Sequence, residues 1–306
     1  MLELDFINID QEKVRKIKDK AIERIYLDEE MRIFIEENKL PRSFVYENLS
    51  DFIKVLENRK LCKNCQGLKL CSKNGCSLDL EIDKINLRTN VTFSSCKLLR
   101  KRRNIYNKFI ICSCDQECFD YELKDCTAFF KEDRKLILKT LATIIKENSN
   151  RGVYLYGEKG IGKSFLMGVF AKHLVNKREG HFVYIDARDF IPSMVRTSFN
   201  KDKEDFKEDL ELLKTVDYLF IDNFGEEEKN DFSKESIILE VLTYRKENSL
   251  PTYITSIHSI SSLYSAYRTP KSGNYKTKDI ISCIEETCEI VSLPTSSRIA
   301  TGIFEK

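Results

Sequence analysis

The chain has 306 residues, of which 33% are charged and 42% hydrophobic, and its formal net charge at pH 7 is +2. A charge so close to zero excludes a globally basic nucleic-acid-binding protein but leaves room for local basic patches. The first residues, MLELDFINID, lack the apolar core of a signal peptide, and no run of about 18 apolar residues occurs. We therefore expect a cytoplasmic protein without membrane association, long enough for two domains.

Residues 1–60 have helical periodicity. Apolar side chains recur there at three- and four-residue spacing, and Pro41 separates the second helical stretch from the third. The pattern predicts a helical N-terminal region of three amphipathic helices. Their apolar stripes fit burial in a common core and docking on a partner helix equally well.

The segment 61–126 contains nine of the eleven cysteines. In a reducing cytoplasm, metal binding explains such a density better than disulfides do. The predicted zinc ligands are Cys62, Cys65, Cys96 and either Cys76 or Cys71. The first two form a C-x-x-C pair, a spacing with which two thiolates can hold one tetrahedral Zn²⁺. We therefore predict a zinc-binding module over this segment.

The remaining cysteines carry a weaker signal. A second group consists of Cys112, Cys114, Cys118 and Cys126. Its spacing matches no established ligand pattern, so a second metal site is left open. Cys283 and Cys288 are expected to be core residues of a late helix.

Between the two cysteine groups lies a basic stretch, LLRKRRNIYNKF, at residues 98–109. It has no acidic residue, and it includes Tyr106 and Phe109. Such a stretch can follow a nucleic-acid backbone and stack on bases, but it is also common on a solvated helix face. A contact with single-stranded DNA is one of these two open interpretations.

Residues 127–306 change to short apolar runs that alternate with charged helical segments. The runs are VYLYG at 153–157, HFVYID at 181–186, YLFID at 218–222 and TYITS at 252–256. An amphipathic stretch, KEDRKLILKTLATIIKEN, precedes the first run. Apolar strands separated by helices predict βαβ units, and therefore an α/β domain built on a parallel sheet.

The stretch LYGEKGIGKSF, residues 155–165, joins the first strand to a helix through a glycine-rich loop. Its glycines allow backbone N–H groups to turn toward the phosphates of a nucleotide at a helix N-terminus. Lys163 adds a positive charge for those phosphates, and Ser164 offers a hydroxyl ligand for Mg²⁺. The predicted nucleotide-binding residues are Gly157, Gly160, Ile161, Gly162, Lys163, Ser164, Phe165 and Asp222.

Asp222 is the expected acidic companion of this loop. It ends the apolar run YLFID, where a carboxylate can hold the Mg²⁺ shell directly or through water. The combination of loop and acid predicts that the domain binds MgATP.

The order of helical head, cysteine-rich module and phosphate-loop domain resembles the bacterial replicative helicase loaders, the DnaI/DnaC-like AAA+ ATPases of the primosome. The stretches that carry the resemblance are LYGEKGIGKSFLMGVFAKHL, YLFIDNFGEE, RKENSLPTYITS and Cys62-x-x-Cys65-x-x-Leu-x-x-Cys71. The cysteine-rich head favours the DnaI-like branch, which has an N-terminal zinc domain. The resemblance implies an N-terminal domain that binds the hexameric replicative helicase and an AAA+ domain that binds ATP and single-stranded DNA. Self-association is left open.

The chain departs from the family pattern at residues on which hydrolysis depends. Family members carry a second acid after the Mg²⁺ aspartate, where this chain has Asn223. An amide cannot accept a proton from water, so general-base assistance of about 10²–10⁴-fold should be lost. Glu226 lies close by in sequence, and whether it compensates is open.

Two further departures concern the sensor and the arginine finger. Ile257 occupies the place of a polar sensor, and KTKDIISCIEETCEI, residues 276–290, offers no arginine to a neighbouring subunit. An arginine finger contributes about 10³–10⁵ in turnover in related enzymes. Arg298 is the candidate sensor within the same subunit, and a role for Arg268 is open.

The predicted catalytic residues are Lys163, Asp222, Asn223 and Arg298. We expect a helicase loader that uses ATP mainly as a conformational ligand, with weak hydrolysis. An active ATPase of the transposition-helper type and a non-hydrolysing adaptor with a zinc-binding head remain alternatives. A phosphotransferase finds less support in the sequence.

Overall fold

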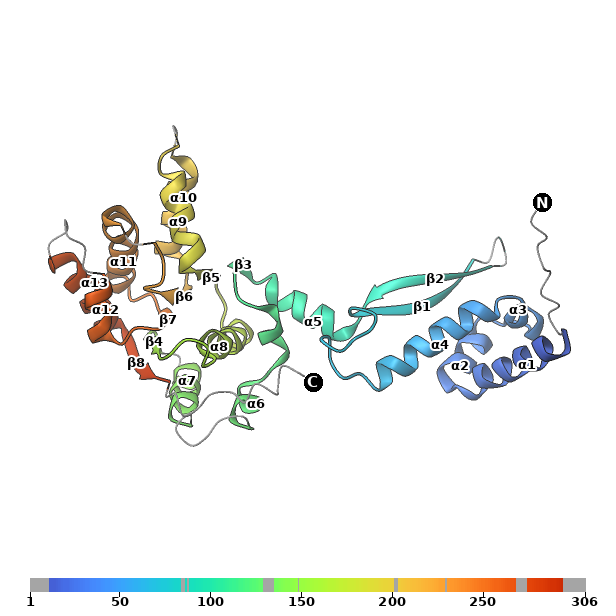
Figure 1. Cartoon of the computed structure of the whole chain (residues 1–306). Coiled ribbons are helices and arrows are strands. Elements are labelled where there is room, and N and C mark those ends of the chain that lie inside the picture. Colours follow the sequence, from blue (N-terminus) through green and yellow to red (C-terminus); the bar gives the residue numbers. More distant parts are fainter. Residues whose placement is uncertain are drawn as a thin grey trace, which may run out of the picture. The chain divides into compact units, whose positions relative to one another are not determined.

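The computed structural model describes residues 11–83, 86, 88–128, 135–147, 149–200, 203–228, 230–267 and 274–293 (Figure 1). The chain divides into two compact units, Met1–Lys101 and Arg102–Lys306.

The first unit packs helices against a two-stranded hairpin. Its helices are α1 (Gln11–Leu27), α2 (Glu29–Glu37), α3 (Arg42–Glu47) and α4 (Leu49–Lys63), and its strands are β1 (Cys76–Asp83) and β2 (Arg88–Ser95). The strands pair antiparallel, with Cys76 opposite Ser95. The predicted helices correspond to α1, α2 and α4, while α3 is an additional short helix that begins directly after Pro41.

One apolar core holds this unit together. Phe52, Val55 and Leu56 of α4 are fully buried and share the core with Leu78 and Leu80 of the hairpin. The two leucines are two positions apart on β1, so they point to the same face of the hairpin. This hairpin was not predicted; it lies in the segment interpreted as a cysteine-rich zinc-binding module.

The second unit is built on a six-stranded parallel sheet with the order β3-β5-β6-β7-β4-β8. The strands are β3 (Phe109–Cys112), β4 (Gly152–Tyr156), β5 (Phe182–Asp186), β6 (Tyr218–Phe224), β7 (Thr252–Ser256) and β8 (Cys288–Ser292). The four predicted strands are confirmed as the central ones, β5, β6, β7 and β4. The predicted α/β class is confirmed for this unit.

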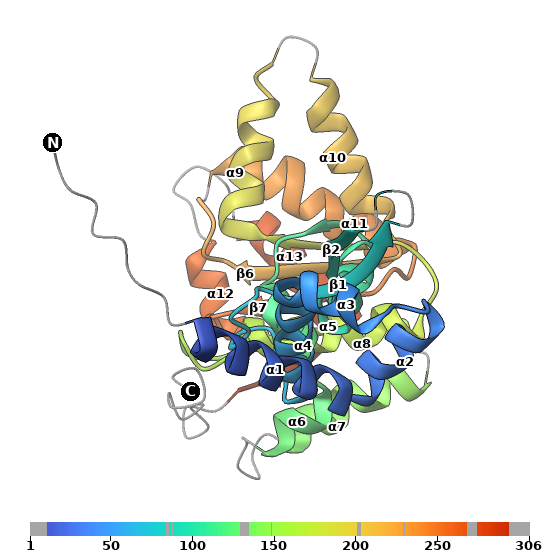
Figure 2. The same ribbon diagram turned by 90° about the vertical axis from the view of Figure 1, so that its right-hand side faces the viewer.

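Helices cover both faces of the sheet, and each face has its own apolar core. One face is covered by η1 (Gln116–Asp120), α6 (Leu123–Ala128), α7 (Lys135–Glu147) and α8 (Lys163–Lys177). The other is covered by α9 (Ala187–Thr197), α10 (Glu204–Thr215), a π-helical segment at Ser233–Leu239, α11 (Glu240–Glu247), α12 (Ile260–Ala266) and α13 (Asn274–Thr287). Figure 2 shows α9 and α10 side by side above the strands. Within the described ranges, no helix combines the length and apolarity needed to cross a membrane.

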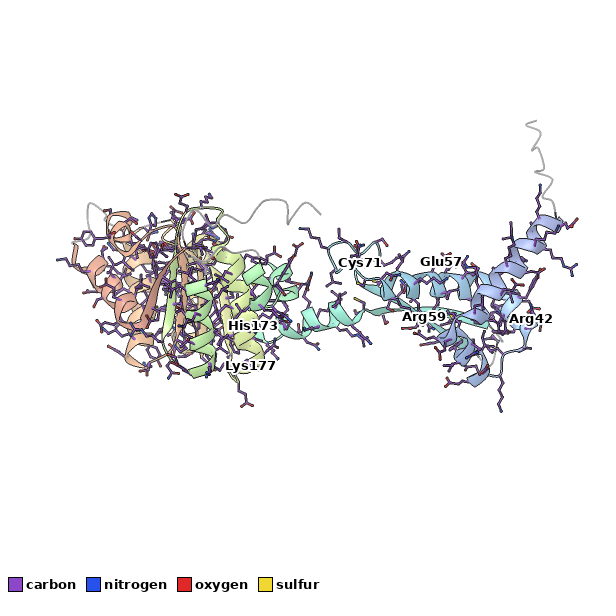
Figure 3. All side chains as sticks on the ribbon, turned by 90° about the horizontal axis from the view of Figure 1, so that it is seen from below. Arg42, Glu57, Arg59, Cys71, His173 and Lys177 are labelled. Carbon is purple, nitrogen blue, oxygen red and sulfur yellow. The ribbon has the colours of Figure 1, made fainter. Side chains whose placement is uncertain are left out.

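The boundary between the two units differs from the expected one at 126/127. Strand β3 pairs with β5, and the segment after it packs on α8, so both belong to the sheet domain. Lys172 of α8 is 1% exposed, and its ammonium group donates to the Tyr121 carbonyl and the Glu122 carboxylate, both at 2.7 Å. His173, labelled in Figure 3, accepts the N–H of Leu123 at 3.1 Å. The second cysteine group therefore belongs to the sheet domain.

One detail of the cysteine prediction needs correction, the placement of Cys288. Cys118 and Cys126 are buried in the core beside α8. Cys283 lies on α13 as expected, but Cys288 is the first residue of β8. The helix ends at Thr287 because the next residues pair with β4 at the edge of the sheet.

Candidate nucleotide-binding site

The glycine-rich loop lies between β4 and α8, at the carboxyl edge of the sheet. Gly160 and Gly162 adopt left-handed backbone conformations, with φ of 78° and 93°, and Gly162 is the N-cap residue of α8. Because glycine lacks a Cβ atom, it adopts these angles without steric strain. At Gly157, a Cβ atom would lie 2.5 Å from the Leu293 carbonyl oxygen, so the close passage of the chain also requires glycine there.

Lys163 is held across this loop. Its side chain is 6% exposed, and its ammonium group donates to the carbonyls of Gly157 and Glu158, both at 2.9 Å. Burial lowers the pKa of Lys163, and the carboxylates of Glu226 and Asp222 act in the opposite direction. The cation is thus fixed where the phosphates of a nucleotide at the N-terminus of α8 would lie.

Ser164 and Asp222 meet at the start of the same helix. The Ser164 hydroxyl donates to Asp222 Oδ1 at 2.9 Å, and the Thr255 hydroxyl and the Asn223 N–H donate to the same oxygen. Burial raises the pKa of Asp222, although the hydrogen bonds from Thr255 and Ser164 act to lower it. A hydroxyl and a carboxylate oxygen are ligands that Mg²⁺ prefers, so these residues fit the ion that accompanies ATP. The contact from Thr255 was not expected from the sequence.

Asn223 follows Asp222 in a left-handed conformation, with φ of 56°. Asparagine tolerates this region better than most residues. Its side-chain amide donates to Asp186 Oδ2 at 2.9 Å, while its backbone N–H also donates to the Thr255 hydroxyl at 3.1 Å. The predicted catalytic position is therefore connected to a neighbouring strand that the sequence analysis did not place in the site.

Asp186 ends β5, directly opposite Asp222 in the pairing of β5 with β6. The Arg188 side chain binds it through Nε at 3.0 Å and a terminal nitrogen at 2.6 Å. Burial alone would raise the pKa of Asp186, but the hydrogen bonds from Arg188 and Asn223 outweigh it and lower the pKa. In the sequence, this aspartate was recognised only as the end of a strand.

The other predicted positions are placed as follows. Ile161 is fully buried, and the Phe165 ring contacts the Tyr121 ring with centroids 5.1 Å apart, so both side chains contribute to the core. Ile257 is half-buried just after β7. Arg298 and Arg268 lie outside the described residues.

Glu226 and Glu227 follow the turn after β6. Glu226 is half-buried, and its backbone N–H donates to the Asn223 carbonyl at 3.1 Å. Glu227 is 3% exposed, and its carboxylate accepts the Gly225 N–H at 2.7 Å and the Tyr267 hydroxyl. Glu227 therefore stabilises the turn instead of facing the nucleotide site.

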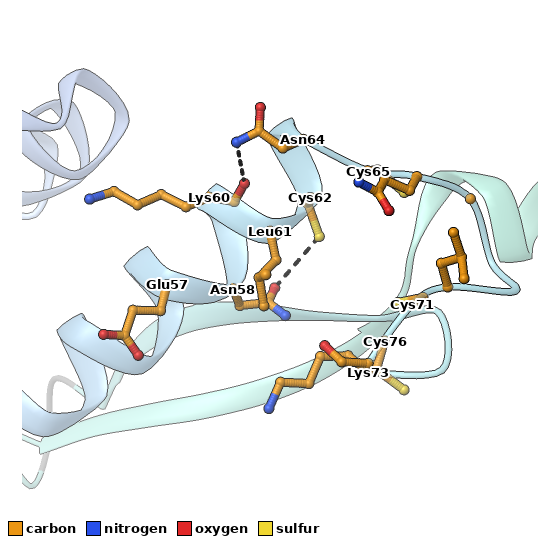
Figure 4. A pocket seen from close by; sticks show the side chains of 14 residues that line it. Glu57, Asn58, Lys60, Leu61, Cys62, Asn64, Cys65, Cys71, Lys73 and Cys76 are labelled. Atoms are coloured by element: carbon orange, nitrogen blue, oxygen red, sulfur yellow. Dashed lines mark hydrogen bonds between the residues drawn. The ribbon is translucent and has the colours of Figure 1, made fainter. Parts of the chain in front are cut away.

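In the first unit, a pocket of about 680 Å³ is lined by Cys62, Cys65, Cys71 and Cys76 (Figure 4). The Cys62 pKa is raised by burial and by the thiols of Cys65, Cys71 and Cys96. Backbone N–H groups donate to the sulfurs of Cys71 and Cys96, each at 3.4 Å. Across the described ranges, however, no three His, Cys, Asp or Glu side chains are gathered closely enough to hold a metal ion.

The basic stretch forms α5 (Lys97–Tyr106) and the start of β3. Arg102 binds Asp120, and Lys108 donates to the Val175 carbonyl at 3.3 Å. Phe109 is buried, with its ring centroid 5.9 Å from those of Phe119 and Phe182, so it cannot stack on a base as the sequence suggested.

The fold and the site define a phosphate-loop domain of the α/β class, in which Lys163, Ser164 and Asp222 converge at the carboxyl edge of a parallel sheet. The comparisons agree with this class. The family model of the bacterial DnaA ATPase domain matches residues 134–256. Over 139 residues the chain is 26% identical to the chromosomal replication initiator protein DnaA of Treponema pallidum. This aligned region covers 45% of this chain and 30% of that protein.

A longer part of the chain is similar to helicase loaders. The chain is 22% identical over 260 residues to the replicative helicase loader DnaI of Bacillus subtilis, covering 80% of this chain and 79% of that protein. Crystal structures of DnaI and of the DnaC helicase loader match with TM-scores of 0.52 and 0.50, at 21% and 20% identity. These matches cover 61% and 59% of this chain, and 98% and 100% of those chains. The part of the chain that these structures match therefore has the fold of the DnaI and DnaC structures.

Proposed function

We propose that the protein is a replicative helicase loader that acts in DNA replication. The observation that carries the proposal is the similarity to Bacillus subtilis DnaI, which spans 80% of this chain and therefore includes part of the first unit. In this proposal the sheet domain binds ATP and Mg²⁺, and the first unit binds the hexameric replicative helicase.

The residues of the loop suit ATP binding. Backbone N–H groups at the start of α8 and the Lys163 ammonium group would bind the phosphates, while Ser164 and Asp222 would hold Mg²⁺. When bound, the ion would neutralise charge on the phosphate oxygens. Asn223 cannot accept a proton, so we expect slow hydrolysis, and ATP would act mainly as a conformational ligand.

The first unit exposes large apolar side chains on α1 that suit contact with a protein partner. Leu27 is 84% exposed and Ile17 is 67% exposed, although both lie on a helix that also contributes Ile25 to the core. A pocket of about 510 Å³ lies beside Leu27 and is lined by Ile22, Glu23, Tyr26, Leu27 and Arg42. Apolar side chains around a hollow are typical of binding sites for a partner protein.

Two further parts of the proposal concern zinc and DNA. We propose that Cys62, Cys65, Cys71 and Cys96 bind Zn²⁺, because Cys65, Cys71 and Cys96 act electrostatically on Cys62, and Cys71 and Cys96 accept backbone N–H groups. Binding would have to draw these thiols closer together than they lie in this structure. We propose that α5 contacts single-stranded DNA through exposed Arg100, Lys101, Arg103 and Tyr106. Phosphate contacts of this kind weaken steeply with salt, which gives them a simple test.

The experiment that tests the proposed function measures nucleotide and helicase binding on the full chain. A fluorescent ATP analogue should bind in the presence of Mg²⁺, and Lys163→Ala should abolish that binding. The chain should co-elute with a replicative helicase hexamer, and Leu27→Asp should weaken the complex, whereas the similarly exposed Leu136→Asp in the second unit should not. Absence of nucleotide binding would favour an adaptor, and absence of helicase binding would exclude a loader.

A further inference from the structure

Two side chains at the candidate nucleotide site, the carboxylate of Asp186 on β5 and the amide of Asn223 on β6, contact each other. The position after Asp222 on β6, where an acid is expected, is occupied by Asn223. An acid lies instead at the end of β5, where the Asp186 carboxylate accepts a hydrogen bond from the Asn223 side-chain amide at 2.9 Å. The pairing of the strands sets Asp186 opposite Asp222, so all three side chains lie at the carboxyl edge of the sheet. In an open parallel sheet, ligands bind at this edge.

Two of the other acids near the site, Asp222 and Glu227, have different tasks. Asp222 Oδ1 accepts hydrogen bonds from three groups, among them the Ser164 hydroxyl at 2.9 Å, and Asp222 is the candidate Mg²⁺ ligand. Glu227 is buried and holds the Gly225 N–H and the Tyr267 hydroxyl. Asp186 caps α9, since its Oδ1 accepts the Arg188 N–H at 3.0 Å. It differs from the other two because its side chain is 16% exposed and it also accepts the amide of Asn223, the residue that stands in place of the expected acid.

We propose that Asp186 is the carboxylate that activates the attacking water, and that Asn223 orients the same water through its side-chain amide. The inference rests on the proposed function, because it requires ATP in the site. In the reaction, the water oxygen bonds to the γ-phosphorus while the bond from that phosphorus to the β–γ bridging oxygen breaks. The bridging oxygen leaves on ADP with the electron pair, and the proton lost by the water passes to the Asp186 carboxylate.

Arg188 controls this carboxylate. Its guanidinium group binds both oxygens of Asp186, at 3.0 and 2.6 Å. A carboxylate paired with a guanidinium in this way is a poor proton acceptor, because the pair stabilises its charged form. Turnover is therefore slow while Arg188 is bound, and it increases when the arginine swings away. The Arg188 side chain is 45% exposed, so it has room to move.

The test separates turnover from nucleotide affinity. Single-turnover hydrolysis of radiolabelled ATP and equilibrium binding of a non-hydrolysable analogue are measured on the full chain, with and without helicase and single-stranded DNA. Asp186→Asn should lower the rate about 10²-fold, the loss typical of a removed general base. It should leave affinity unchanged or increase it a few-fold, because a negative charge beside the triphosphate is removed. A variant that only damaged the fold would lower both.

Three more variants complete the test. Arg188→Gln should raise the rate several-fold, and the exchange Asp186→Asn with Asn223→Asp should restore it by placing the acid on β6. Asp189→Asn, an exposed acid on the same helix, is the matched control and should change neither quantity. An undiminished rate in Asp186→Asn, or a wild-type chain that binds the analogue but never hydrolyses ATP, would overturn the inference alone. A wild-type chain that does not bind the analogue would overturn the proposed function as well.

Discussion

The Ser164 hydroxyl donates to Asp222 Oδ1 at 2.9 Å, although 58 residues separate the two along the chain. This contact joins the start of α8 to β6, and it brings together the two candidate oxygen ligands of Mg²⁺ that the sequence placed in separate motifs. Asp222 is 7% exposed, so its charge is kept in a buried position. Residues that bind ligands commonly hold such unfavourable charges, which produces a conflict between stability and function.

Asp222→Asn should therefore stabilise the ligand-free protein and abolish its response to nucleotide. The amide retains an oxygen for the donors around it, but it removes the buried charge. We expect the midpoint of thermal unfolding to rise by a few degrees, corresponding to about 1 kcal/mol, and we expect MgATP to produce no further increase. Thermal unfolding of both proteins with and without MgATP checks this; a variant less stable than the wild type would contradict the argument.

The stability difference between these two proteins should depend on pH. Burial raises the pKa of Asp222 above its usual value of 3.8. A group whose pKa is raised on folding contributes stability below its unfolded pKa and loses it as pH rises through the folded value. The advantage of Asp222→Asn should thus be smallest at and below pH 3.8 and should grow to a plateau above the raised pKa. Urea denaturation across this range measures the difference, and a constant difference would argue against a buried, ionised Asp222.

Arg245→Met should strongly destabilise the second unit. Arg245 is 1% exposed, and its guanidinium group donates to the carbonyls of Leu213, Lys214, Val216 and Pro251 and to the Thr252 hydroxyl. Methionine fills a similar volume but leaves these acceptors without donors, at about 1–3 kcal/mol for each group that water cannot reach. We expect a total loss of about 3 kcal/mol or more in urea denaturation.

Arg151→Met provides the control for this change. Arg151 pairs with Glu289 at 3.0 Å, with both side chains 48% exposed. Exposed ion pairs contribute about 0–1 kcal/mol. Equal losses in the two variants would show that burial of the Arg245 guanidinium group does not determine its effect.

Cys71→Ser should remove bound zinc, whereas Cys76→Ser should leave it. In the proposed zinc site, Cys71 accepts the Gly75 N–H at 3.4 Å and acts electrostatically on Cys62, while Cys76 begins β1. Zinc content of the purified proteins, measured by elemental analysis, distinguishes them. Full zinc in Cys71→Ser with loss in Cys76→Ser would reverse the assignment of the fourth ligand.

Gly152→Ala should prevent β4 from pairing normally. A Cβ atom there would lie 1.8 Å from the Thr252 carbonyl oxygen, so the two strands would have to separate. We expect a loss of about 3 kcal/mol or more, at the upper end of overpacking effects. At Gly160, a Cβ atom would contact nothing within 4 Å, so Gly160→Ala should lose only the strain of a left-handed residue, about 1 kcal/mol. Chemical denaturation of both variants compares them directly.

The parts of the fold that could be predicted are those with strong local signals. β4, β5, β6 and β7 are buried on both faces, and such strands appear in sequence as continuous apolar runs. β3 and β8 lie at the edges of the sheet, and FIIC and CEIVS are too short or too close to a helix to stand out. The edges were therefore missed for a physical reason, since an edge strand needs fewer apolar residues.

The same distinction holds for the site. Lys163, Ser164 and Asp222 were predicted because their spacing is tied to one chemical task. Asp186 and Thr255 were not, because they reach the site through the pairing of strands distant in sequence. Such contacts exist only in the folded sheet. Local sequence contains no record of which strand lies beside which.

Strand β3 limits where the first unit could be replaced by a different N-terminal domain through recombination. The strand covers one side of β5, and its Phe109 packs on Phe182 of that strand. A recombination event that replaced the head at the end of the cysteine-rich segment would remove this strand and leave β5 as an open edge, prone to pairing with other chains. Viable chimaeras with other heads should instead be joined near Lys101, where the two compact units divide.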